Sequence, residues 1–345
     1  MIGSYPVFAL EEWVQRVFQR MNVPPQHAAT AAALLVRSDV RGYTTHGIGR
    51  LPAYVERLES GEFNPTPTMR PRVEVAVVEL DADGAMGHVA APTAIELGLA
   101  ELQRYASVFI SVRDCGHLGA LGIHTLRAAE GGAFCLAGQR TPPRLAMPGF
   151  NAAAIGHNPI SFACPLPGQD PIVFDIACSV AARGHIMKAA REGRPIPAGW
   201  AIDSNGDPTT DAEEALKGNL LPMAGHKGLG LAMLIQCLTT AFTVPGAAAN
   251  RAATVKGAGG RQPAFFWLLA PDALGHRDAF RNAMNDWTGY FLDVGGEAAR
   301  LPGHRGAALE RRARENGLAF TPSVEGDLRT LGDKLGVPFP SAGRG

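Results

Sequence analysis

A short apolar strand that ends in a glycine-rich turn and a helix limits the folds open to this chain. The strand is Val108-Phe-Ile-Ser-Val112, the turn runs from Arg113 to Gly122, and the helix is expected over residues 123–130. In α/β proteins this succession places ligand contacts at the end of the strand and the start of the helix. Strands and helices also alternate over residues 133–192 and 264–292, so an α/β fold is predicted.

The usual dinucleotide-binding motif is missing. Gly228-Leu-Gly230 is followed by Leu-Ala-Met, so no Gly-x-Gly-x-x-Gly lies between a strand and a helix. A conventional Rossmann domain is therefore disfavoured. The same turn carries His226 and Lys227 and could offer backbone amides and an ammonium group to a phosphate. No P-loop, His-Glu-x-x-His or Gly-x-Ser-x-Gly motif occurs, so metal and serine hydrolases are disfavoured and no metal site is predicted.

The stretch Arg41-Gly-Tyr-Thr-Thr-His-Gly-Ile-Gly-Arg-Leu-Pro-Ala-Tyr54 places a histidine and an arginine four residues apart. If the segment after Gly47 is helical, as its apolar spacing suggests, His46 and Arg50 share one face. An imidazole transfers a proton near neutral pH, and a guanidinium binds a carboxylate through two hydrogen bonds. The pair therefore suits a 2-oxo or 2-hydroxy acid, although the same spacing is also typical of solvated helix faces.

Hydrophobic periodicity predicts most of the remaining elements. Ser323 is the expected N-cap of the last helix, and an Asn-Gly step at 205–206 is typical of a hairpin. The other expectations are helices over 6–21, 27–40, 92–105, 180–192 and 324–335, a single strand over 72–80, and a mobile loop over 246–262.

Composition excludes several classes of protein. The 32 basic residues balance 32 acidic ones, so nothing favours binding to nucleic acid or to an anionic membrane. No apolar run approaches the roughly 20 residues of a membrane span, and the first residues lack the features of a signal peptide. Five scattered cysteines without a Cys-x-x-Cys pair indicate reduced thiols and a cytoplasmic protein.

Five stretches taken together resemble the malate/L-lactate dehydrogenase family, which is distinct from the Rossmann-fold dehydrogenases. They keep their order and spacing over nearly the whole chain, and they are Ser38–Gly47, Gly116–Ala120, Gly156–Ala163, Asp175–Gly184 and Ala224–Ala232. The resemblance implies a non-Rossmann NAD(P)-binding sheet domain over residues 71–299. It also implies an α-helical domain made of residues 1–70 and 300–345, and a homodimer.

The resemblance also implies roles for individual residues. His46, oriented by Thr45, would donate the proton in reduction and accept it in oxidation, while Arg50 would hold the carboxylate of a small acid substrate. His117 would lie beside both the substrate and the nicotinamide. The cofactor is NADH or NADPH: a basic residue near the adenosine ribose favours the 2′-phosphate of NADPH, Arg305 and Arg140 are the candidates for it, and the sequence leaves the choice open. The residues that would contact the cofactor are His117, Gly119, Ala120, Ser161, Asp175, Ile176, Ala177, His226, Lys227, His304, Arg305 and Gly306.

Four positions depart from the family pattern. Thr44-Thr45 replaces the usual Asp-Ser before the histidine, His157 replaces a threonine, and His185 stands where relatives carry Lys or, in imino-acid reductases, Asp. Three functions remain open at this point. The first is reduction of a 2-oxo acid to a 2-hydroxy acid, and the second is reduction of a cyclic imino acid such as piperideine- or pyrroline-2-carboxylate. The third is non-catalytic binding of NAD(P).

Overall fold

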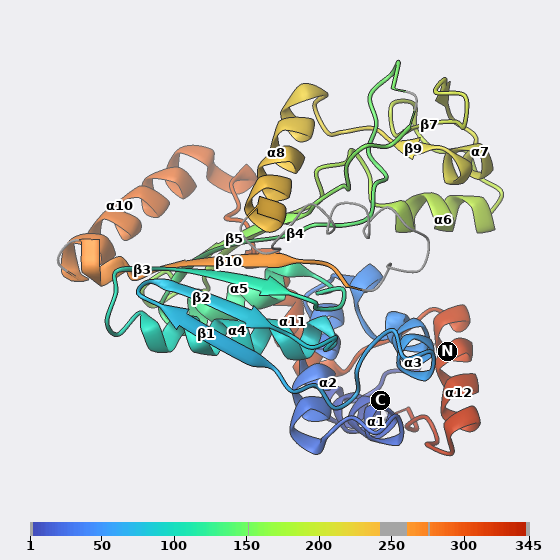
Figure 1. Cartoon of the computed structure of the whole chain (residues 1–345), viewed down its shortest axis with the longest axis horizontal. Helices are drawn as coiled ribbons and strands as arrows, with labels where there is room; N and C mark the ends of the chain where they lie inside the picture. Colours follow the sequence, from blue (N-terminus) through green and yellow to red (C-terminus); the bar gives the residue numbers. More distant parts are fainter. Residues whose placement is uncertain (1–2, 151, 242–260, 275–276, 343–345) are drawn as a thin grey trace.

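A mixed seven-stranded sheet forms the centre of the molecule (Figure 1). The computed structural model describes residues 3–150, 152–241, 261–274 and 277–342. The strands lie in the order β1-β2-β3-β10-β4-β5-β6, and only β2 and β3 pair in parallel. Their bounds are β1 Arg70–Glu74, β2 Val77–Asp81, β3 Ser107–Arg113, β4 Phe134–Gln139, β5 Ile160–Cys164, β6 Ile172–Ile176 and β10 Ala264–Leu269.

Helices cover both faces of this sheet (Figure 1). Two helices, α4 (Gly87–Glu101) and α5 (Leu121–Glu130), pack on one face against β3 and β5, and they contact each other. On the other face lies α8 (His226–Gln236), whose π-helical continuation Cys237–Ala241 contacts β10. The central strands are therefore covered on both sides, whereas all five residues of the edge strand β1 are exposed.

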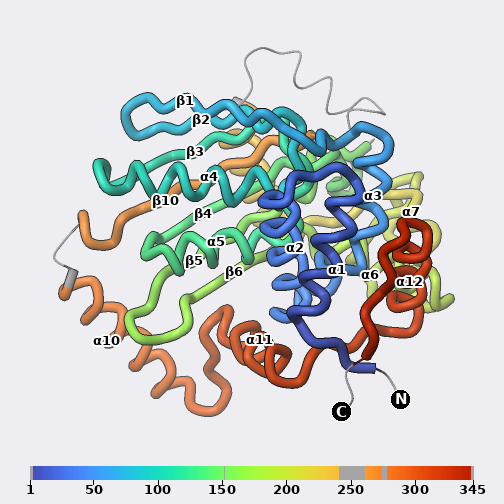
Figure 2. Tube along the Cα trace, turned by 90° about the horizontal axis from the view of Figure 1, so that it is seen from below, coloured from blue at the N-terminus to red at the C-terminus, as the bar shows by residue number. Residues whose placement is uncertain are grey.

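A second group of helices joins the two ends of the chain (Figure 2). It contains α1 (Val7–Arg20), α2 (Pro25–Val40), α3 (Leu51–Glu59), α11 (His304–Asn316) and α12 (Pro322–Leu335). Tyr5 pairs with Leu318, which fixes the first residues beside the start of α12. One apolar core runs from this group into the sheet, from Trp13 through Leu35 to Phe266. The division into two domains therefore stays a prediction.

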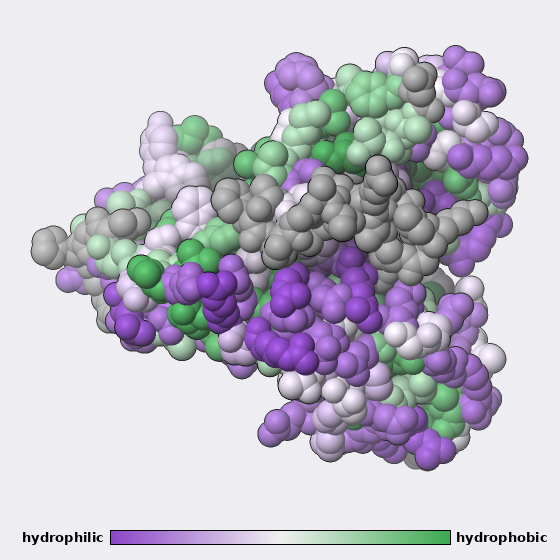
Figure 3. Space-filling model, in the orientation of Figure 1, coloured by the Kyte–Doolittle hydropathy of each residue, from purple (hydrophilic) through white to green (hydrophobic). Residues whose placement is uncertain are grey.

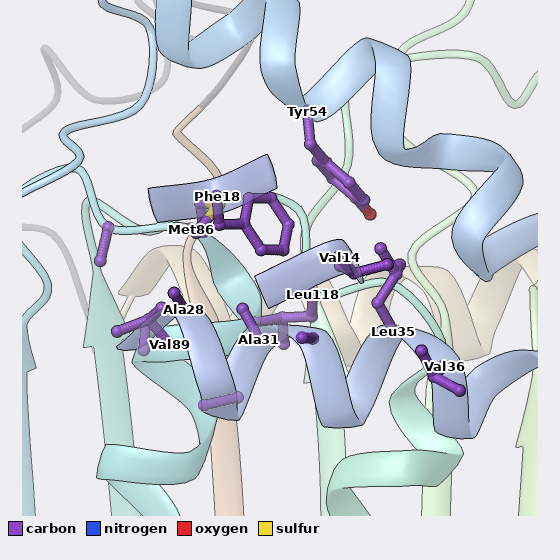
Figure 4. Close-up of a cluster of buried hydrophobic side chains, with 14 of the residues drawn as sticks. Val14, Phe18, Ala28, Ala31, Leu35, Val36, Tyr54, Met86, Val89 and Leu118 are labelled. Carbon is purple, nitrogen blue, oxygen red and sulfur yellow. The ribbon is translucent and has the colours of Figure 1, made fainter. Parts of the chain in front are cut away.

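The buried core also fixes the elements that carry the predicted site. Figure 4 shows Tyr54 projecting from α3 toward the cluster that contains Leu118, the residue after His117. Both side chains are almost fully buried, Tyr54 with 2% and Leu118 with 0% of its surface exposed. Burying large apolar side chains at this junction, at about 25 cal/mol per Å², holds α3 and the turn of His117 in place.

A smaller three-stranded sheet lies beyond the end of the main sheet (Figure 1). Its strands are β7 (Ala201–Ile202), β8 (Pro208–Thr209) and β9 (Asn219–Leu220). They pack with α6 (Arg183–Arg191) and α7 (Ala212–Lys217) around a separate apolar cluster. The hairpin expected at the Asn-Gly step is present, because β7 and β8 pair in antiparallel fashion across it.

Three expectations about element boundaries were wrong. The strand predicted over 72–80 is a hairpin, β1 and β2, that turns at Val75 with φ 52°. A β-branched residue with positive φ is rare, so the sequence gave no turn signal there. The helix predicted from Pro92 begins at Gly87 and contains Pro92 in its interior. The N-cap of α12 is Thr321, because Pro322 occupies the first helical position.

Two further expectations concern residues 246–262 and the segment after Gly47. The expected mobile loop over 246–262 lies outside the described residues except for its last two positions. The segment after Gly47 forms a 3₁₀ turn, Ile48–Arg50, which leads directly into α3. His46 belongs to a separate 3₁₀ turn, Thr44–His46, so it does not share a helix face with Arg50.

Candidate active site

A buried carboxylate fixes the turn that carries His46. Asp39, near the end of α2, accepts a 2.6 Å hydrogen bond from the backbone amide of Ile48. Gly47 lies against the same carboxyl group, and a Cβ at this position would overlap it. Burial raises the pKa of Asp39 to about 7, and the hydrogen bond from Ile48 opposes that shift. The turn of His46 is thus tied to α2.

The imidazole of His46 is half-buried and oriented by its neighbour. Its Nδ1 lies 2.9 Å from the hydroxyl oxygen of Thr45, and the orienting role of Thr45 stays a prediction. Burial, then the charges of Arg50 and His157, lower the pKa of His46 to about 4. His46 is therefore neutral at pH 7 in the free protein.

His117 lies next to His46, and its contact with substrate and nicotinamide stays a prediction. The two rings are stacked, with centroids 5.6 Å apart and planes 23° from parallel. The Nδ1 of His117 accepts a 3.3 Å hydrogen bond from the amide of Gly119 and lies 3.1 Å from the hydroxyl of Tyr54. Because an amide can only donate, Nδ1 is the acceptor and the neutral ring carries its proton on Nε2. Burial, then the charge of His46, holds the pKa of His117 well below its usual range.

The glycine-rich turn around His117 is fixed by β4 and α4. The side chain of Gln139, the last residue of β4, accepts a 3.0 Å hydrogen bond from the amide of Leu118 and donates one to the carbonyl of Gly116. Gly87 begins α4 directly against the turn, and a Cβ there would overlap the backbone of His117. Gln139 at the end of β4 thereby fixes the turn of His117, which follows β3 in the sequence.

Arg50 offers a free donor close to both histidines. The side chain is half-buried, and its Nε has no hydrogen-bond partner among the described residues. Its charge lowers the pKa of both His46 and His117. The charge of Arg50 and a side-chain hydrogen bond between Arg50 and Tyr54 oppose the burial that raises the pKa of Tyr54, so Nε of Arg50 is the buried nitrogen that is left without a partner among the described residues. A buried guanidinium donor without a partner is costly, so the arrangement suits a carboxylate ligand.

Two of the positions that depart from the family pattern, Thr45 and His157, lie close to His46. A Cβ on Gly184, in the first turn of α6, would lie 3.5 Å from Cγ2 of Thr45. His157 is close enough for its charge to lower the pKa of His46. Its Nδ1 is 3.3 Å from the hydroxyl oxygen of Thr141. By contrast, His185 is exposed, with its ring 6.4 Å from that of Trp200.

Two residues predicted to contact the cofactor are bonded within the protein. Asp175 on β6 accepts a 2.7 Å hydrogen bond from the amide of Gly122 and so caps the start of α5. Ser161 on β5, its direct neighbour in the sheet, lies 2.8 Å from the hydroxyl oxygen of Thr125 and is fully buried. Their contact with a cofactor stays a prediction.

The other predicted cofactor residues flank β6. His226 and Lys227 are exposed in the first turn of α8, which packs against Cys178 just after β6. The run His304–Arg305–Gly306 begins α11, next to Val173 of the same strand. Both helices start at a glycine with positive φ that offers no side-chain cap. The amides of Lys227, Gly228 and His304 donate to backbone carbonyls of the preceding turns. Contact of these helix starts with a cofactor therefore stays a prediction, as it does for Gly119, Ala120, Ile176 and Ala177.

The two arginines expected near the ribose differ in environment. Arg305 is exposed at the start of α11, so its side chain is accessible. Arg140 is buried, and one of its terminal nitrogens lies 3.3 Å from the hydroxyl oxygen of Thr240. Of the two, only Arg305 is open to a 2′-phosphate in this arrangement.

Solved structures of oxidoreductases share this fold. A sulfolactate dehydrogenase from Methanocaldococcus jannaschii matches 98% of this chain and 98% of its own, with a TM-score of 0.85 and 26% identity. A delta1-piperideine-2-carboxylate reductase from Pseudomonas syringae covers 95% of this chain and 99% of its own, with a TM-score of 0.83 and 27% identity. The predicted fold class is confirmed: this is an α/β protein of the malate and sulfolactate dehydrogenase type.

The family follows from the sequence. The model for malate/L-lactate dehydrogenase matches residues 6–329, and the chain belongs to that family. A (2R)-3-sulfolactate dehydrogenase (NADP(+)) from Chromohalobacter salexigens is 30% identical over 311 residues, 90% of this chain and 92% of the relative. A delta(1)-pyrroline-2-carboxylate reductase from Pseudomonas fluorescens is 32% identical over 339 residues, 96% of this chain and 100% of the relative. The predicted NAD(P)-dependent oxidoreductase is confirmed at the level of the family.

No group of three or more His, Cys, Asp or Glu side chains in the described part of the chain could hold a metal ion. None of the helices found in that part is both long and apolar enough to cross a bilayer.

Proposed function

We propose that the protein reduces a 2-oxo acid to the 2-hydroxy acid with NADH or NADPH. The observation that carries the proposal is the free Nε of Arg50 close to the stacked rings of His46 and His117. This places a carboxylate binder and two imidazoles at one point, which a 2-oxo acid needs at its two adjacent functional groups.

Each residue has a part in the reaction. Arg50 binds the substrate carboxylate and so fixes the adjacent carbonyl group against the two imidazoles. When bound, the cofactor supplies the hydride in reduction and takes it up in oxidation. His46 gives its proton to the carbonyl oxygen in reduction and removes it from the hydroxyl in oxidation. Binding of the carboxylate neutralises Arg50, one of the charges that depress the pKa of His46, so the ring gains protons more readily in the complex.

A substrate panel tests this function against its alternatives. We expect NADH or NADPH oxidation with at least one open-chain 2-oxo acid among pyruvate, oxaloacetate and 2-oxoglutarate, and a loss of about 10²-fold or more in His46→Gln. The relatives named for pyrroline- and piperideine-2-carboxylate favour a second candidate, reduction of a cyclic imino acid. Turnover of the cyclic imine alone would replace the first proposal. Cofactor binding without any turnover would instead favour a non-catalytic role.

Lys227 is the residue that we assign to the cofactor phosphates. It is exposed at the start of α8, which has no side-chain cap, so its ammonium and the positive end of the helix dipole act on the same anion. Lys227→Ala should raise the KM for the dinucleotide several-fold and leave the KM for the acid nearly unchanged. Lys188→Ala, an exposed lysine on α6, is the matched control.

A homodimer is the assembly that we propose. Four side chains on α10 (Arg277–Gly295) form an apolar stripe at helical spacing, and they are Trp287 (51% exposed), Tyr290 (70%), Phe291 (42%) and Val294 (67%). Hydrophobic residues also reach the surface around α8 (Figure 3), where Met233 is 51% exposed. Light scattering should give twice the chain mass, and Val294→Glu should shift it toward monomer, whereas Phe8→Glu on α1 should not.

The cytoplasm is the compartment that we propose. The cysteines of the described residues are all free, and four of the five are buried. Free buried thiols are typical of a reducing compartment. Cell fractionation with an antibody against the intact chain would test this location.

A further inference from the structure

The ring of His117 has one nitrogen bonded inside the protein and one left open. Its Nδ1 accepts a 3.3 Å hydrogen bond from the amide of Gly119 and lies 3.1 Å from the hydroxyl of Tyr54. Its Nε2 has no hydrogen-bond partner within the described ranges, and it is not enclosed, because the ring is only half-buried. An incoming molecule can therefore reach His117 through Nε2, beside the stacked ring of His46.

A backbone amide determines which nitrogen of His117 carries the proton. Because the amide of Gly119 can only donate, Nδ1 keeps its lone pair, and the neutral ring has its proton on Nε2. Gly119 has a φ of 75°, and a Cβ there would lie 2.8 Å from Nε2 of the buried His88. Glycine is the residue that takes this backbone conformation without strain. The tautomer with an open Nε2–H is therefore built into the turn.

Hydrogen bonds on both sides of His117 hold the turn that carries the ring. Gln139 bonds to the carbonyl of Gly116 and to the amide of Leu118. The buried ring of His124 lies with its Nε2 2.7 Å from the carbonyl oxygen of Leu118. Since a carbonyl can only accept, His124 donates this bond and fixes the peptide group that follows Leu118. The open N–H of His117 is thus positioned before any ligand binds.

The titratable groups around His117 oppose a positive charge on its ring. They are all bases, and they are His46, Arg50, His88 and Arg57. Burial, then the charges of these groups, holds the pKa of His117 well below its usual range. A protonated His117 would be partly desolvated and would face only like charges, so the site favours the neutral ring.

We propose that His117 is a neutral hydrogen-bond donor, which holds the carbonyl oxygen of the substrate through Nε2–H and transfers no proton. This inference rests on the proposed function, in which His46 gives the proton and Arg50 binds the carboxylate. Negative charge develops on the carbonyl oxygen while the carbonyl carbon is reduced. A donor that is already fixed in direction stabilises this charge without reorganisation. The two stacked imidazoles thus have different tasks.

Two substitutions separate hydrogen-bond donation from proton transfer. His117→Gln places an amide N–H near the position of Nε2, whereas His117→Ala removes the donor. For the best 2-oxo acid of the panel, we expect kcat/KM to fall by no more than about tenfold in His117→Gln and by about 10²- to 10³-fold in His117→Ala. His27→Ala, at the opposite end of α2 from the His46 turn, is the control and should leave kcat/KM unchanged. Equal losses in the two His117 variants would overturn the donor role.

The pH profile distinguishes His117 from the proton donor. In His117→Gln, kcat/KM in the reduction direction should keep the pH dependence of the wild type, because His46 still supplies the proton. If the dependence disappeared in this variant, His117 would be the acid and the proposal would be wrong.

Nitrogen NMR of the intact wild-type protein reads the tautomer directly. With 15N-labelled histidine, and with His117→Gln to assign the signals, we expect a protonated Nε2 and an unprotonated Nδ1 from pH 8 down to pH 5.5. A proton on Nδ1, or conversion to the imidazolium within that range, would overturn the proposal whatever the variants show.

Oxamate, an unreactive analogue of a 2-oxo acid, separates this proposal from the proposed function. With NADH or NADPH present, oxamate should move the Nε2 signal of His117, whereas acetate, which has no second carbonyl group, should not. A shift with oxamate in a protein that reduces no 2-oxo acid would support the donor site and reject the proposed reaction. Turnover of a 2-oxo acid without such a shift would reject the donor site alone.

Discussion

The carboxyl group of Asp39 occupies the space that a side chain at position 47 would need. Only glycine, which has no Cβ, fits at position 47 without overlapping this carboxyl group. The short distance also lets Asp39 accept a hydrogen bond from the backbone amide of Ile48. The two residues lock the turn of His46 against the end of α2. The position of the His46 turn thus depends on the buried pair of Asp39 and Gly47.

Gly47→Ala should disturb this pair. The new methyl group would overlap the Asp39 carboxyl group, so either the turn of His46 moves or the hydrogen bond to Ile48 breaks. We expect a loss of about 1–3 kcal/mol in the free energy of unfolding and a loss of at least tenfold in kcat/KM. Denaturant unfolding and steady-state kinetics measure both quantities.

Gly49→Ala is the matched control for this prediction. A Cβ at position 49 would lie 3.5 Å from Cγ1 of Val324, which is ordinary van der Waals contact. The double variant Gly47→Ala/Asp39→Ala should be less destabilised than the sum of the two single variants, because removing the carboxyl group frees the space. Simple additivity would contradict the steric explanation.

Thr45→Val should lower turnover without unfolding the protein. The hydroxyl of Thr45 is the only group within hydrogen-bond distance of Nδ1 of His46 among the described residues, and valine keeps the shape of the side chain. Losing the orienting contact should lower kcat about tenfold. Thr44→Val, at an exposed neighbouring hydroxyl, should change kcat less than twofold. Equal losses in both variants would show that the Thr45 contact has no orienting role.

The sequence indicated the residues of the candidate site better than the residues that hold them in place. The sequence singled out His46, Arg50 and His117 because each lies in a short motif with its own chemistry, and the structure brings the three residues together. Asp39 and Gln139 were missed, since each acts on a residue that is distant along the chain or lies in another element. The spacing of residues within one helix or strand does not indicate contacts with residues that are distant in the sequence.

Tyr54 was missed for a different reason. It stands inside the predicted stretch, four residues after Arg50, yet an aromatic residue at helical spacing is usually part of a core. The structure shows that Tyr54 belongs both to the core and to the candidate site. Its ring is buried, and its hydroxyl lies 3.1 Å from Nδ1 of His117.

The pH dependence of the two reaction directions should differ. With a pKa of about 4, His46 in the free protein is protonated below that value and neutral above it. Reduction needs the protonated ring, so kcat/KM for the 2-oxo acid should fall about tenfold per pH unit from pH 5 to 8. Oxidation needs the neutral ring, so kcat/KM for the 2-hydroxy acid should stay nearly level over that range. A level profile in the reduction direction would rule out His46 as the proton donor.

Tyr54→Phe should separate the positioning of His117 from the packing of the core. Phenylalanine keeps the buried ring and removes only the hydroxyl that lies 3.1 Å from Nδ1 of His117. We expect a cost of about 1 kcal/mol in the free energy of unfolding, together with a drop of about three- to tenfold in kcat/KM as His117 loses a fixed orientation. Tyr5→Phe removes an equally buried hydroxyl that accepts a hydrogen bond from Arg329, far from the site. That control should cost similar stability and leave kcat/KM unchanged, so a parallel loss of activity in both variants would assign the effect to stability alone.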